Sequence, residues 1–85
     1  RAPEGSSMEF MKKSGYVSQS IAIESALQVG FMLVATSEIN ANPKDTADHP
    51  KGVWTLPPSF RLQNVDKSKY QDIGESDRMT LLFIK

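Results

Sequence analysis

The sequence predicts a small α+β fold, with one main helix packed on an antiparallel pair of strands and a long irregular excursion between the strands. Three observations predict it. A stretch with helical periodicity over residues 18–29 runs into Gly30, an apolar run follows over residues 31–37, and a second apolar run closes the chain over residues 79–84. No other run has the length and composition of a strand, so these two are expected to pair with each other.

The main helix is predicted by its apolar stripe and by its two ends. Ile23, Ala26 and Leu27 follow the i, i+3, i+4 spacing that places side chains on one face of a helix. Ser18 is suited to the N-cap, and Gly30 to the left-handed position just past the last turn. The helix is therefore expected to turn directly into the strand that follows it.

The strand over residues 31–37 is apolar at most positions rather than at every second one. That pattern is typical of a strand that is covered on both faces. The closing run over residues 79–84, Met-Thr-Leu-Leu-Phe-Ile, is also apolar on both faces. These strands are therefore expected to need cover from other elements.

The chain is expected to form one small domain or a part of one, in four segments. Residues 1–15 are a loop with a short helix over residues 8–13, and residues 16–37 are the helix–strand unit. Residues 38–78 are the excursion, and residues 79–85 are the final strand.

The excursion is rich in proline and asparagine and too long for an ordinary connection. Trp54 and Phe60 are expected to hold it onto the body of the protein. On that expectation, Trp54→Ala would destabilise the chain by about 2–4 kcal/mol, the range of large-to-small core changes. A short helix over residues 67–73 is expected between Asp66 as its N-cap and Gly74 just past its end.

Composition excludes several classes of function. Ten basic residues balance ten acidic ones, which removes the electrostatic argument for nucleic acid or an anionic membrane. No apolar run approaches the roughly 20 residues of a membrane span. The absence of cysteine excludes disulfides and thiolate metal sites, and the five glycines are too scattered for a phosphate-binding loop. The compartment stays open, with the cytoplasm as the default.

His49 is the only histidine, and Asp45 and Asp48 are close to it in the sequence. An imidazole beside carboxylates suits a metal site or a general base. A solvated loop histidine is the more frequent outcome, and one histidine without cysteine fits no zinc spacing. The sequence thus favours a solvated His49 and identifies no catalytic residue and no metal ligand.

Trp54 shortly precedes the paired prolines Pro57 and Pro58. An aromatic side chain in such a loop either anchors the loop to the core or lines a ligand pocket or partner surface. The anchor is the favoured interpretation.

The run from Ala26 to Ala35, with its Gly30–Phe31 step, resembles the last helix and sixth strand of class I S-adenosylmethionine-dependent methyltransferases. The stretches Ser37–Pro58 and Gly74–Leu81 resemble the tail of a group of bacterial predicted methyltransferases, and Arg1–Pro3 resembles the segment after that group's fifth strand. The resemblance covers nearly the whole chain but only the C-terminal portion of the family.

The resemblance implies a sheet of order 3-2-1-4-5-7-6 with an antiparallel seventh strand. It implies that the cofactor lies at the carboxyl ends of the early strands, which have no counterpart in this chain. No cofactor-binding residue and no cofactor is therefore expected in the isolated chain. Residues 40–58 would help to shape an acceptor pocket, with His49 and Trp54 as the candidate residues.

Two functional hypotheses follow. The first is a C-terminal methyltransferase fragment that is inactive alone, and the second is a free-standing binding or assembly module. In both, one edge of the strand over residues 79–84 is left without a neighbour. A homodimer through that edge is expected, with Met79, Leu81 and Phe83 as its apolar residues.

Overall fold

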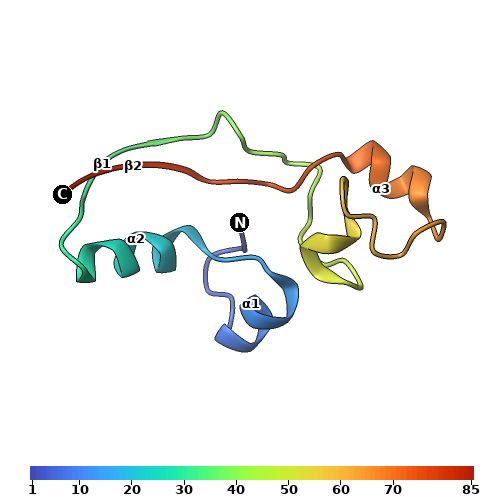
Figure 1. Ribbon diagram of the computed structural model, residues 1–85, viewed down its shortest axis with the longest axis horizontal. Helices are drawn as coiled ribbons and strands as arrows, with labels where there is room; N and C mark the ends of the chain where they lie inside the picture. The colour runs from blue at the N-terminus through green and yellow to red at the C-terminus, as the bar shows by residue number, and fades with distance from the viewer.

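The computed structural model describes all residues from 1 to 85 and shows a small α+β fold with a two-stranded antiparallel sheet (Figure 1). The class predicted from the sequence is confirmed, as is the antiparallel pairing. The elements, in chain order, are α1 (Met8–Ser14), α2 (Gln19–Gln28), β1 (Met32–Ser37), the short 3-10 helix η1 (Gly52–Thr55), α3 (Lys67–Ile73) and β2 (Thr80–Ile84).

Strands β1 and β2 pair with Met32 opposite Ile84 and Ser37 opposite Thr80. The register shifts between Leu33 and Ala35, which leaves one extra residue on β1 as a bulge. The last strand begins at Thr80, one residue later than the sequence predicted.

The two chain segments stay together beyond the sheet, and Figure 1 shows them side by side as they leave it. The Arg78 amide donates to the Asn40 carbonyl at 3.1 Å, and the Asn40 side chain donates to the Thr80 hydroxyl at 2.8 Å. The Asn42 side chain donates to the carbonyl oxygens of Ile73 and Glu75, each at 2.7 Å. The ends of the excursion are therefore joined by asparagine side chains where the regular ladder stops.

The ends of the helices follow local chemistry. The Ser7 hydroxyl accepts from the Phe10 amide and begins α1, and Gly15 ends it in the left-handed conformation. Gly30 follows α2 with a φ of 98°, as expected. Ser18 makes no side-chain cap, and the Glu4 carboxylate accepts from the Ser20 amide instead, at 3.3 Å.

The buried core lies around α1 and the start of the excursion, and not between α2 and the sheet. Gly52 of η1 approaches the Ser14 carbonyl so closely that a Cβ there would lie 2.3 Å from that oxygen. Its φ of 62° is also in the region that favours glycine. The core cluster consists of Ala2, Met11, Tyr16 and Ala47, with Phe10, Ile21 and Val53 packed against it.

The helix–strand unit, by contrast, is largely uncovered, although Ile21 at the start of α2 packs against the core. Helix α2 buries none of its residues, and every residue of β1 is exposed. Val29 is 65% exposed and Met32 is 62% exposed. The radius of gyration is 14.2 Å, against about 12 Å for a compact domain of this length. The cover that the apolar strands lead one to expect is not supplied by residues 1–85.

The excursion is held by residues other than those the sequence favoured. Thr55 and Leu56 are completely buried, whereas Trp54 is 39% exposed and Phe60 is half-buried. The Trp54 ring lies against Gly15, which has no side chain to keep it away. The Trp54 side chain thus partly covers the end of α1, and the fully buried Leu56 is the residue that holds the excursion in the core.

We expect Leu56→Ala to destabilise the protein by about 2–5 kcal/mol, because it empties a fully buried site. Trp54→Ala should cost less than Leu56→Ala, since the indole keeps much of its exposure in the folded state. Urea denaturation followed by circular dichroism measures both, and a larger loss for Trp54→Ala would restore the tryptophan as the main anchor.

Candidate functional site

The Asp45 carboxylate is the centre of a buried polar cluster. Its side chain is fully buried and accepts hydrogen bonds from four groups. The Tyr16 hydroxyl lies 3.0 and 2.8 Å from the two carboxylate oxygens, and the amides of Ala47 and Asp77 donate at 2.9 Å each. The fourth partner is Nε2 of His49, 2.8 Å from Oδ1.

His49 is not the solvated loop residue that the sequence favoured. Its side chain is only 5% exposed, and its ring packs edge to face on Tyr70 of α3, with the centroids 5.6 Å apart. The loop turns at Ala47, which is in the left-handed conformation, so that the chain returns toward Asp45. That turn is the local reason why a histidine four residues after an aspartate reaches it.

The surroundings of Asp45 and Tyr16 keep each of these two groups in one protonation state. Burial raises the pKa of Asp45, but the hydrogen bonds from the Asp77 amide, Tyr16, the Ala47 amide and His49 outweigh it and hold that pKa below its ordinary value. Burial, together with the hydrogen bond to Asp45, raises the pKa of Tyr16. The tyrosine therefore stays a donor and the aspartate stays an acceptor.

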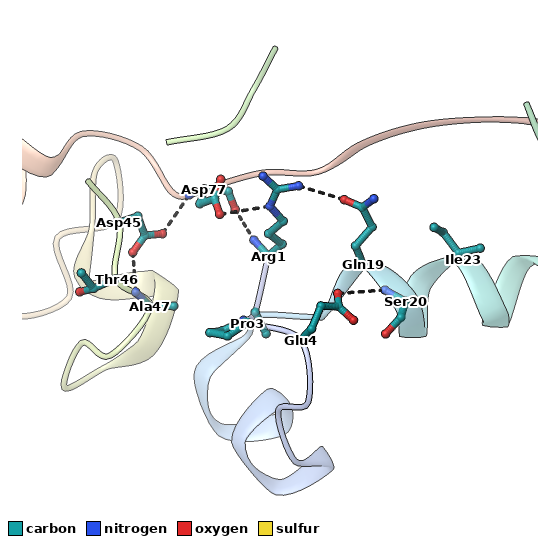
Figure 2. A pocket seen from close by; sticks show the side chains of 11 residues that line it. Arg1, Pro3, Glu4, Gln19, Ser20, Ile23, Asp45, Thr46, Ala47 and Asp77 are labelled. Atoms are coloured by element: carbon teal, nitrogen blue, oxygen red, sulfur yellow. Dashed lines mark hydrogen bonds and ion pairs between the residues drawn. The ribbon is translucent and has the colours of Figure 1, made fainter. Parts of the chain in front are cut away.

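A second polar group, centred on Arg1, lies next to this cluster. Its guanidinium donates to both carboxylate oxygens of Glu38 at 2.7 Å, to Gln19 at 2.9 Å and to Asp77 at 3.2 Å. Figure 2 shows Arg1 between Asp77 and Gln19. The hydrogen bond with Glu38 is the main cause that raises the pKa of the Arg1 side chain, although burial opposes it. Arg1 thus links α2, the residue after β1 and the loop before β2.

Two open grooves lie beside the Arg1–Asp77 pair. The larger, about 490 Å³, runs between the first residues of the chain, the start of α2 and the loop at Thr46 and Ala47 (Figure 2). The smaller, about 340 Å³, lies beside Val53 and Met79. Neither of these two grooves is lined by His49 or Trp54.

The candidate dimer-edge residues divide by burial. Met79 lies outside β2 and lines the smaller groove, while Leu81 and Phe83 are half-buried. Leu82 and Ile84, on the alternate positions, are the exposed ones. The exposed apolar residues of β2 are therefore Leu82 and Ile84, and not the predicted Met79, Leu81 and Phe83.

Two residues of the site carried no usable sequence signal. Tyr16 lies 29 positions from Asp45, and Arg1 lies 76 positions from Asp77. The nearness of Asp45 to His49 was visible in the sequence, but the burial of the two side chains was not.

No three His, Cys, Asp or Glu side chains are grouped so that they could hold a metal ion. No helix combines the length and apolarity that crossing a bilayer requires.

The stability of the protein should depend on the ionisation of Asp45. A carboxyl group with a lowered folded pKa stabilises the folded state above its unfolded pKa, about 4, and that contribution is lost as pH falls through the folded value. We expect Asp45→Asn to cost about 2–4 kcal/mol at pH 7, because buried donors lose a charged acceptor. The difference from the unsubstituted chain should shrink below pH 4.

Urea denaturation at pH 7 and at pH 3 measures this effect. Asp48→Asn is the matched control, since Asp48 lies on the same loop but is exposed. Equal losses for the two variants at pH 7, or a constant Asp45→Asn difference across this pH range, would contradict the assignment.

Comparison of the chain with protein-family models, with curated proteins and with solved structures gave no match.

Proposed function

We propose that this chain is the C-terminal portion of a class I S-adenosylmethionine-dependent methyltransferase and is inactive by itself. In this proposal, α2, β1 and β2 are the last helix and the closing antiparallel strands of the enzyme's sheet. The resemblance of Ala26–Ala35 and Gly74–Leu81 to that family motivates it. The observation that supports it best is the uncovered apolar surface of the helix–strand unit.

That surface is unusual for a protein that acts alone. Apolar side chains at Leu27, Val29, Met32, Val34 and Leu82 are exposed within one small unit. Each fully buried Val, Leu, Ile or Met side chain stabilises a fold by roughly 1.5–3 kcal/mol, so leaving several in water forfeits a large contribution. Contiguous exposed apolar surface commonly marks a place where other protein packs. A neighbouring strand and covering helices would supply that cover.

The polar half of the chain would then be an attachment at the edge of the enzyme. Arg1, Asp77 and Asp45 fix the excursion to both ends of the helix–strand unit. In the proposal these groups hold the chain together, and the binding of S-adenosylmethionine belongs to the preceding part of the enzyme.

The proposal predicts that the native gene product is larger than the 9.4 kDa of this chain, and that the isolated chain does not bind S-adenosylmethionine. Intact-mass spectrometry of the native product tests the first statement. Isothermal titration tests the second, with the native product as the positive control. A native mass of 9.4 kDa, or micromolar binding by the isolated chain, would each refute the proposal.

A second candidate, an assembly module, is favoured by one specific observation. Strand β2 has β1 on one side and no strand on the other, and Leu82 and Ile84 on it are exposed. Natural proteins usually protect such edges with charge or proline, and β2 has neither before Lys85. Antiparallel pairing with a second copy would give a four-stranded sheet with two-fold symmetry, which is the commonest kind of closed contact.

The assembly module predicts a dimer of the isolated chain. Light scattering on a size-exclusion column should then give about twice the monomer mass of 9.4 kDa. Leu82→Pro, which removes a backbone donor, and Leu82→Lys, which places charge on the edge, should both return the chain to a monomer. Leu27→Lys on the exposed side of α2 is the control and should leave the dimer intact. A monomer at high micromolar concentration would exclude this candidate.

A further inference from the structure

The imidazole of His49 is held in one tautomer by its surroundings. Nε2 lies 2.8 Å from Oδ1 of Asp45, and no other polar contact of this ring occurs in the protein. An ionised carboxylate can only accept a hydrogen bond, so Nε2 carries the proton. In the neutral ring Nδ1 is then the unprotonated nitrogen, and its lone pair points away from Asp45.

Nδ1 is not fully enclosed, although the ring is almost completely buried. Nδ1 has no hydrogen-bond partner, and no buried side-chain nitrogen or oxygen in the structure is left without one. Nδ1 must therefore reach the surface. The Tyr70 hydroxyl satisfies the same two conditions: it has no hydrogen-bond partner in the protein, and the residue is only 4% exposed. Two packed rings thus present one polar atom each to the outside.

We propose that His49 is a proton-accepting residue whose Nδ1 takes a proton from a hydroxyl or ammonium group of a ligand. In that step the N–H bond forms at Nδ1 as the O–H or N–H bond of the ligand breaks, and the electron pair stays on the ligand atom. Asp45 acts as a positioning residue that fixes the ring and its tautomer, as buried carboxylates do for histidines in acid–base and metal sites.

Several features of the cluster favour this role over a purely structural one. A histidine that only fills space would be expected to use both nitrogens inside the protein or to lie in solvent. His49 instead has one nitrogen fixed by a carboxylate that is itself held by Tyr16 and two backbone amides, and the other nitrogen free. Of the charged groups, Asp45 contacts the ring directly, and Asp48 precedes His49 on the same loop. The inference rests on the proposed function only in naming the ligand as the methyl acceptor.

The test uses the 85-residue chain itself, in which His49 is the only histidine. Nitrogen-15 NMR of the imidazole at neutral pH should show a protonated Nε2 and a bare Nδ1. Diethyl pyrocarbonate should then modify the single imidazole, as Nδ1 attacks a carbonyl carbon of the reagent and ethyl carbonate leaves. The rate should be within about tenfold of that for N-acetylhistidine, whereas a sealed ring would react only through unfolding, on the order of 10³-fold more slowly.

The variants separate positioning from burial. Asp48→Asn should leave both the tautomer and the rate unchanged, and His49→Gln should abolish the imidazole product. Asp45→Asn should redistribute the tautomers. Because that variant can also unfold, the NMR spectrum of the unsubstituted chain decides on its own. A proton on Nδ1, or modification at the rate of global unfolding, would overturn the proposal. Neither result depends on cofactor binding, so failure here is distinct from failure of the methyltransferase proposal.

Discussion

The part of the structure with a buried core depends on keeping one carboxylate ionised away from water. An unpaired charge in that position would cost several kcal/mol, and it is tolerated because every acceptor direction of Asp45 is used. Two of the four donors, Ala47 and His49, belong to the loop of Asp45 itself. The other two come from distant segments: Tyr16 between α1 and α2, and the Asp77 amide before β2. One side chain therefore fixes three crossing segments at a single point.

The same atoms determine which chemistry the site can support. A carboxylate whose lone pairs are all engaged by donors is a poor base and a poor metal ligand, so Asp45 acts by orienting His49. The hydrogen bond fixes the imidazole through Nε2 and leaves Nδ1 without a partner in the protein. Arg1 is the central residue of the second polar group, on the other side of Asp77 from Asp45. Most of its guanidinium donors are used by Glu38 and Gln19. Its role is thus to link segments, and it is poorly placed to recruit an anion.

Local chemistry in the sequence was sufficient to place the three α-helices and the two strands, but not η1. Ser7 and Gly15 bound α1, Gly30 ends α2, and the two apolar runs become the paired strands, because caps and turns depend on residues within a few positions. The Asp45 cluster could not be predicted in the same way. Its contacts join residues dozens of positions apart, and no periodic pattern records which tyrosine or amide will meet a given carboxylate.

Burial was the other point at which the sequence misled. The apolar runs over residues 31–37 and 79–84 predict that the strands are buried, but they do not identify the segment or protein that packs against them. Trp54 was expected to anchor the excursion because of its size, yet a large ring on a loop is easily left at the rim. The smaller Leu56, one residue beyond η1, is the side chain that is completely enclosed.

Because Trp54 lies against Gly15, its fluorescence reports on one local contact in the protein. It is the only tryptophan, and its environment is set by the contact between η1 and the end of α1. Its emission therefore follows the docking of the excursion onto the N-terminal helix and is insensitive to β1 and β2. Circular dichroism follows the backbone of both parts. Coincidence of the two signals distinguishes a single cooperative unit from a firmly held polar half joined to a separately melting sheet.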